Sequence, residues 1–259
     1  MKNYKKLENQ PLKFALAEFR FSPVMQISEY IPRLQEALRK EYPIPDKKGE
    51  QVVQVQPGGI SVSQIDRWAF ISADKRSAID INQERLIYVT ADYPRFEGFA
   101  HACETALNSL IDIVEPSLIL RIGLRFSDLV IVGEGETISE LVDSQFSTPS
   151  CIESLGQIQQ QRSEFFLSTD LGGLAIRTLY GHHNLSSLPD VQGLPVLIDR
   201  DDSVSERIIL DFDHYWEPSD EPVSFEADTI IDYLTKLHDI SRDAFWRTTT
   251  DYARNKKWS

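Results

Sequence analysis

The sequence is poor in cysteine, with two among 259 residues. Cys103 falls within an apolar helical pattern, whereas Cys151 follows Pro149 and Ser150 in a segment expected to be a loop. Two cysteines in such unlike settings are typical of a protein from a reducing compartment, where disulfide bonds are rare. We therefore expect both thiols to remain unpaired, with a single bridge as the less favoured alternative.

Long apolar runs are also missing. No stretch approaches the roughly 20 apolar residues of a membrane-spanning helix, and the basic segment 1–10 is not followed by an apolar run of signal-peptide length. Hydrophobic residues make up 41% of the chain and charged residues 26%, the proportions of a folded globular protein. We therefore expect a folded, cytoplasmic protein without a membrane segment.

Positive charge is scarce, and the deficit lies in one half of the chain. Residues 1–115 contain 15 Lys and Arg against 16 Asp and Glu, whereas residues 116–259 contain 12 against 24, for a formal net charge of −13. An acidic field repels phosphate backbones, so we do not expect direct binding to nucleic acid, but it favours a basic protein partner. A solvated acidic surface that only keeps the protein soluble is the simpler alternative.

Motifs of nucleophilic catalysis and phosphate-binding glycine loops are absent from the sequence. The nearest approach to a metal-binding set, His182 and His183 with His214, is loosely spaced, and the first two are expected in a solvated turn. His238 is a candidate acid or base, although a structural place at the edge of the core is favoured. We therefore expect no cofactor and no metal, and we assign no catalytic residue; an enzyme is the third alternative.

Apolar periodicity divides the chain into strands and helices. The first half predicts a strand at 12–21, a helix at 27–40, short strands at 52–56, 60–64, 68–73, 77–81 and 85–90, and a helix at 96–114. The second half predicts a strand at 118–132, a short helix at 138–142, strands at 164–168, 174–180, 194–198 and 207–213, and a long helix from a Ser224 cap. The pattern predicts an α+β fold in which each half has the order β-α-β4-α; in the first half the strand at 77–81 continues into 85–90, so the strands between its helices number four or five.

Short sequence matches indicate that the two halves are copies of one unit. Residues 18–23 read EFRFSP and residues 123–128 read GLRFSD, and residues 85–88 (RLIY) match residues 207–210 (RIIL). A duplication explains these matches, and chance similarity of short strings is the alternative. We predict half-units at 1–116 and 117–259, separate or fused, that form a curved antiparallel sheet with long helices packed on one face.

The order of elements resembles two known architectures, and the sequence itself resembles one family. A tandem β-α-β4-α unit is similar to the TATA-box-binding protein and to helix-grip proteins, a likeness that implies a fold but no function. The chain also resembles a sporadically distributed family of uncharacterised bacterial proteins of about this length. The residues that carry this second resemblance are Pro11, Leu12, residues 19–23 (FRFSP), the helix around 31–42, Leu237, His238, Phe245 and Trp258. The patchy distribution of that family implies an accessory role in a stress, defence or mobile-element module.

Arginines on strands are the candidate ligand-binding residues. Alternate residues of a strand share a face, so Arg121 and Arg125 lie on one face of the strand at 118–132, and we expect Arg20 and Arg177 to join them. Such a face is suited to the carboxylate or phosphate of an anionic ligand. Alternatively, these arginines form structural ion pairs. The candidate acidic partners are Asp80, Asp211 and Asp213.

The missing motifs and the uneven charge favour a non-enzymatic protein that acts through a protein partner, as an accessory or neutralising component. The second hypothesis is that the protein binds a small anionic metabolite or nucleotide between the sheet and a long helix, against Arg121 and Arg125. A homodimer is compatible with either hypothesis.

Overall fold

The computed structural model describes residues 4–259, except 57, 58, 147–151, 153, 154, 157, 192 and 220; at 50–56 and 59–65 it describes the backbone alone. The strands are β1 (Leu12–Phe21), β2 (Ile44–Gln56), β3 (Gly59–Ile71), β4 (Ser77–Ile81), β5 (Arg85–Thr90), β6 (Leu118–Ile131), β7 (Gln160–Ser168), β8 (Gly173–His183), β9 (Ser205–Trp216) and β10 (Val223–Ser224). The helices are α1 (Ile27–Leu38), α2 (Phe96–Val114), α3 (Ile138–Leu141) and α4 (Ala227–Thr248), with short helical turns at Ser144–Phe146, Pro189–Val191 and Ala253–Lys257.

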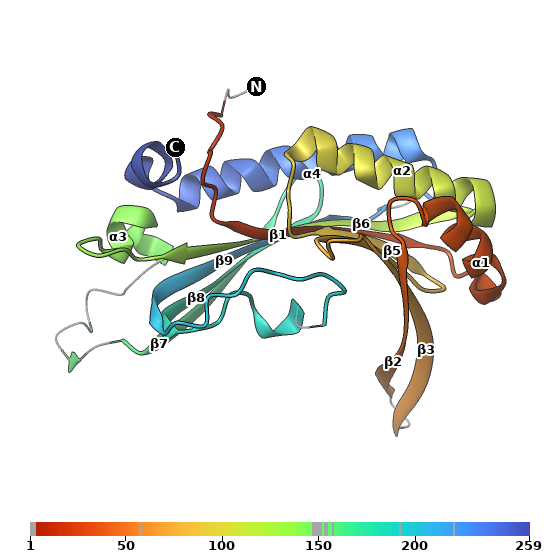
Figure 1. Cartoon of the computed structure of the whole chain (residues 1–259), viewed down its shortest axis with the longest axis horizontal. Coiled ribbons are helices and arrows are strands. Elements are labelled where there is room, and N and C mark those ends of the chain that lie inside the picture. The colour runs from red at the N-terminus through yellow and green to blue at the C-terminus, as the bar shows by residue number, and fades with distance from the viewer. Residues whose placement is uncertain are drawn as a thin grey trace.

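The ten strands of the described residues form one antiparallel sheet that does not close on itself. The order of neighbouring strands is β2-β3-β4-β5-β1-β6-β9-β8-β7, and β10 pairs with β6. The α+β class and the antiparallel sheet predicted from the sequence are therefore confirmed. The opening strands of the two halves, β1 and β6, lie side by side in the middle of the sheet (Figure 1).

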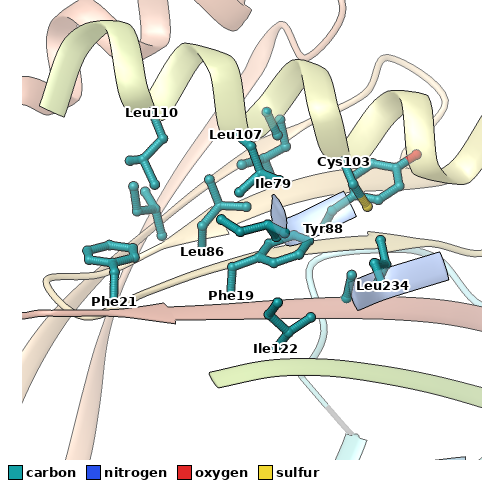
Figure 2. Close-up of a cluster of buried hydrophobic side chains, with 14 of the residues drawn as sticks. Phe19, Phe21, Ile79, Leu86, Tyr88, Cys103, Leu107, Leu110, Ile122 and Leu234 are labelled. Atoms are coloured by element: carbon teal, nitrogen blue, oxygen red, sulfur yellow. The ribbon is translucent and has the colours of Figure 1, made fainter. Parts of the chain in front are cut away.

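Successive side chains of β1 and β6 point to opposite faces of the sheet, and the set on one face packs against the long helices. Phe19 of β1 and Ile122 of β6 are fully buried in one cluster with Leu107 of α2 and Leu234 of α4. Figure 2 shows these four side chains gathered between the helices and the strands. A fully buried Leu, Ile or Phe side chain contributes about 1.5–3 kcal/mol. This cluster joins residues of both halves in a single core.

A long segment covers part of the other side of the sheet. Figure 1 shows α2 and α4 along one side and the segment 184–204 along the opposite side. Val191 and Val196 of this segment pack against Phe14 of β1 and Val89 of β5. The central strands are therefore covered on both faces where these contacts occur.

The strand predicted at 194–198 is wrong. These residues are described as coil and pair with no strand of the sheet. Leu194, Val196 and Ile198 pack against the face of the sheet opposite α2 and α4, and Pro195 has no N–H to donate to a ladder. The strands that follow α3 in the second half are therefore β7, β8, β9 and the two-residue β10.

Other boundaries differ less. The predicted strands at 60–64 and 68–73 belong to one strand, β3, which forms a long hairpin with β2. Ser224 lies in β10, and α4 begins later, at Ala227, after Glu226. In contrast, β1 and α2 have the predicted bounds.

Cys103 lies in α2, where it is a free thiol. It is completely buried, and burial raises the pKa of its thiol well above the ordinary value. Cys151 lies outside the described residues, so the absence of a bridge stays a prediction. None of the described helices has the length and apolar composition that crossing a membrane requires.

Candidate functional site

Two of the predicted arginines lie in a dense ion-pair network on the face of the sheet opposite α2 and α4. Nε of Arg125 lies 3.0 and 2.9 Å from the two carboxylate oxygens of Asp211, and its Nη1 lies 2.8 Å from Asp190. Nη1 of Arg177 lies 3.4 Å from Asp211 and 3.3 Å from Asp213. Carboxylates outnumber guanidinium groups in this network, so it is better suited to structural pairing than to binding an anion.

Burial dominates the electrostatics of this network. Asp211 is fully buried. Its burial outweighs the nearby guanidinium groups of Arg125 and Arg177 and raises the pKa of Asp211 to about 6. Burial acts to lower the pKa of Arg125, but the carboxylates of Asp211 and Asp190 outweigh it, and the pKa is raised overall. The Arg125–Asp211 pair is therefore costly to disrupt from either side.

The other two predicted arginines lie directly opposite each other, Arg20 on β1 and Arg121 on β6. Arg85 of β5 faces Arg20 from its other side, so three like charges stand in a row across the sheet. Such opposition is unfavourable unless it is offset. Glu18 lies 2.7 Å from Nε of Arg20, and the guanidinium of Arg121 lies 4.0 Å from the centre of the Tyr215 ring. These contacts hold Arg20 and Arg121 apart from the network around Asp211.

Asp80, the remaining predicted acidic partner, pairs with Arg67, which was not among the predicted arginines. Nε of Arg67 lies 2.5 Å from Oδ2 of Asp80, across the pairing of β3 and β4. The candidate residues identified from the sequence are thus distributed over three places on this face of the sheet.

A groove of about 860 Å³ opens on the other side of the sheet, beside α4. Phe126 and Asp128 of β6 and Phe212 of β9 line it from the sheet, and α4, the turn at 93–97 and the segment 4–8 also border it. The second hypothesis placed a ligand between the sheet and a long helix against Arg121 and Arg125. The structure has a groove between sheet and helix, but these arginines lie on the opposite face, because their neighbours on β6 are the ones packed against the helices.

The N-terminal segment is attached to α4 and forms one side of the groove. The hydroxyl of Tyr4 donates a hydrogen bond to Asp243, and the Tyr4 ring centre lies 4.6 Å from that of Trp246. Further along, the backbone N–H of Asn9 donates to the carbonyl of Trp258 at 3.1 Å. These contacts join the start of β1 to the end of the chain.

Asp128 is the unusual residue of the groove. It is 4% exposed, and no described residue forms a hydrogen bond or an ion pair with its carboxyl group. Burial, with a smaller effect of the negative charge of Asp211, raises the pKa of Asp128 well above the ordinary value. The register of β1 against β6 shifts between Leu12 and Phe14, at the level of this residue. Such irregularities re-aim side chains and are common beside binding sites.

His238 of α4 forms an aromatic wall of the groove. Its ring stacks on Phe96, with ring centres 3.9 Å apart and planes inclined by 5°. Burial, together with the positive charge of Arg242, lowers the pKa of His238 to about 3. The imidazole is therefore neutral near neutral pH, which is consistent with a place at the edge of the core and not with proton transfer at that pH.

Aromatic side chains make up much of the rest of the groove. The rings of Tyr93 and Phe126 meet edge to face, with centres 5.7 Å apart. The others are Phe212, Phe245 and Trp246. Arg242 and the exposed residues Lys5, Lys6, Glu8, Arg95 and Glu97 surround the opening.

The position of Asp128 along its strand is a sequence signal that our predictions did not use. Asp128 has the same parity on β6 as Leu124 and Phe126, so strand alternation alone places an acid on the face that packs against the helices. An acid on a buried face needs a partner or a function. The walls supplied by the segment 4–8 and by the turn at 93–97 have no comparable signal, because they depend on long-range contacts.

Comparison with known proteins identified no relative: the chain matches no family model, no curated protein and no solved structure. Across the described part of the chain, no cluster of His, Cys, Asp or Glu residues has the makeup of a metal site. His214, considered above with His182 and His183, is buried between the carbonyl of Leu237 and the hydroxyl of Thr169. The geometry of the groove is therefore the main guide to function.

Proposed function

We propose that the protein binds a small organic molecule in the groove beside α4. Asp128 is the observation that carries this proposal, because a buried carboxyl group without a partner costs about 1–3 kcal/mol or more. Sites for small molecules are concave, largely apolar, roughly 300–1,000 Å³ in volume, and contain a few polar groups that orient the ligand. The groove has a volume of about 860 Å³ and combines aromatic walls with the carboxyl group of Asp128.

Replacing Trp246 by alanine should weaken binding of the neutral dye Nile red by about five- to tenfold, because it removes an aromatic wall of the groove. Dye fluorescence titrated with protein measures the dissociation constant. The control is Tyr252→Ala, which removes an exposed aromatic ring outside the groove and should leave the dissociation constant for Nile red unchanged. Equal weakening by both substitutions would show that the dye reports general surface hydrophobicity, and the groove would lose this support.

Docking of a protein partner is a second proposed function, favoured by β7. This strand ends the sheet, and β8 is its one neighbour among the described strands. Phe166 is 67% exposed on it, and its neighbours Phe165 and Leu167 are also exposed. An edge strand offers free backbone donors and acceptors, and an extended segment of a partner can pair with them. Exposed apolar side chains on such an edge favour this mode of recognition.

Charge favours a basic partner over a second copy of the chain. Residues 116–259, which contain β7, carry 12 Lys and Arg against 24 Asp and Glu. Two copies would bring like charges together, whereas a basic segment would be attracted. We therefore propose a partner that adds a basic, extended strand to β7, consistent with an accessory or neutralising role in a bacterial stress, defence or mobile-element module.

Phe166→Lys should abolish retention of such a partner, because it places a positive charge and a long polar side chain on the docking edge. Native mass spectrometry of the tagged protein, purified from its host lysate, measures the stoichiometry of each complex. Val204→Lys, at another exposed apolar position, is the matched control. A partner retained by the wild type and by both variants would contradict docking at β7. A homodimer that is lost only in Phe166→Lys would show that a second copy of the chain, and not another protein, docks on β7.

We also propose that the two halves derive from one duplicated unit, as in the tandem architectures that the order of elements resembles. In support, the strands outward from β1 are β5, β4, β3 and β2, and those outward from β6 on its other side are β9, β8 and β7, so in each half the strand that precedes the long helix lies next to the opening strand. Each half ends in a long helix, α2 or α4. The shared core of α2 and α4 favours half-units at 1–116 and 117–259 that are fused in one domain.

A further inference from the structure

The polar groups at the opening of the groove differ from the one at its floor, on the sheet. Lys5, Lys6, Arg95 and Glu97 are exposed at the opening, where solvent and salt screen their charges. Asp128, in contrast, is 4% exposed and has no partner among the described residues. A ligand that reaches the sheet can therefore supply the partner that the described residues do not.

A carboxylate is an acceptor of hydrogen bonds, so its natural ligand is a donor. Hydrogen bonds between an ammonium group and a carboxylate are among the strongest in proteins, and they are stronger still away from water. A quaternary ammonium ion has charge but no N–H, and it would leave the carboxylate oxygens without hydrogen bonds. The preferred head group is therefore a cation with at least one N–H.

Aromatic rings around Asp128 favour a cation as well. Phe126 lies two residues before Asp128 on the same face of β6, with Tyr93 5.7 Å and His238 6.1 Å from it between ring centres. Rings of this kind attract cations to their faces, by about 0.5–2 kcal/mol. Since His238 is neutral near neutral pH, it adds no repulsion there.

We propose that the ligand of this groove is a small primary or secondary amine, bound as its ammonium ion with N–H groups donating to Asp128. This inference rests on the proposed function of the groove and specifies its ligand class. The volume of about 860 Å³ fits a small molecule, and the aromatic walls fit an apolar body attached to the amine.

Binding of an ammonium ion is coupled to a proton. The ligand enters charged, and its charge favours the ionised carboxylate, so wherever the carboxyl group of free Asp128 is protonated it releases that proton to solvent as the complex forms. Over that pH range affinity should therefore rise with pH until the amine itself loses its proton. Other titratable or charged groups face the groove: from the N-terminal segment Tyr4, Lys5, Lys6 and Glu8, from the turn Tyr93, Arg95 and Glu97, and from α4 His238 and Arg242. The pKa of His238, lowered to about 3, and the raised pKa of Tyr93 place both outside the neutral range.

Tryptamine is a suitable probe because an aromatic body carries its primary amine. We expect isothermal titration calorimetry to show binding to the wild-type protein and about 10- to 100-fold weaker binding to Asp128→Asn. Asp112→Asn makes the same change of charge at an exposed position on α2 and should bind as the wild type does. Tryptophol, which has a hydroxyl in place of the amine, should bind the wild type as weakly as tryptamine binds Asp128→Asn.

The outcomes separate this inference from the proposed function. If tryptophol binds as tightly as tryptamine, or Asp128→Asn keeps full affinity, the groove binds ligands but the amine class is wrong. If neither tryptamine nor the aliphatic diamine cadaverine binds while Nile red still does, the amine class is also overturned. If Nile red fails to bind as well, the proposed function itself falls.

Discussion

Replacing Arg125 by alanine should lower the free energy of unfolding by about 3–5 kcal/mol. Nε of Arg125 donates to both carboxylate oxygens of Asp211, at 3.0 and 2.9 Å, and Asp211 is fully buried. Without it, that carboxylate keeps the longer contact of 3.4 Å to Nη1 of Arg177. Urea unfolding at pH 7.5 measures the loss, and Arg20→Ala, at an exposed pair with Glu18, should cost no more than about 1 kcal/mol.

Two further measurements identify the cause of that loss. Asp211→Asn combined with Arg125→Ala should recover much of the stability, because the buried charge is gone. The loss in Arg125→Ala should also shrink as pH falls toward about 6, because the carboxyl group of Asp211, without the guanidinium that lowers its pKa, takes up a proton at a higher pH in the variant than in the wild type. If Arg125→Ala were as stable as the wild type, the guanidinium of Arg125 would not be needed for folding. It would then be available to an anionic ligand, as the hypothesis from the sequence stated.

Local patterns were enough to predict elements whose apolar residues follow one period. The stripe of Phe99, Cys103, Leu107 and Leu110 recurs at helical spacing, and α2 has the predicted bounds. The segment 194–198 has an equally regular alternation but packs flat on the sheet instead of pairing within it. Alternation reports which side chains are buried, and it cannot distinguish a strand from a segment that covers one.

The arginine network was predictable in part for the same reason. Parity placed Arg121 and Arg125 on one face, and the contacts of Arg125 and Arg177 with Asp211 and Asp213 match the structural alternative. Which arginine meets which acid depends on the register of β6, β8 and β9, and that register is set by contacts between distant segments. The groove was harder to predict, because its walls come from both ends of the chain.

Asp128→Asn should raise the free energy of unfolding by about 1–2 kcal/mol at pH 7.5, because it removes the cost of an unpartnered, buried acid. The folded-state pKa of Asp128 lies well above its unfolded value of about 3.9. The folded protein therefore binds more protons than the unfolded chain, and wild-type stability falls as pH rises from about 4 toward the folded pKa. The asparagine variant lacks this loss, so its advantage should vanish near pH 4 and grow as pH increases.

Urea unfolding of both proteins at pH 4 and pH 7.5 measures this divergence, with Asp112→Asn as a control expected within about 0.5 kcal/mol of wild type at both values. An asparagine variant less stable than wild type at pH 7.5 would mean that the protein already satisfies the carboxylate. Alternatively, Asp128→Asn is more stable than the wild type without ligand, and saturating tryptamine stabilises the wild type alone until the two are equal. That result would show that Asp128 lowers the stability of the fold and is kept because the ligand needs its charge.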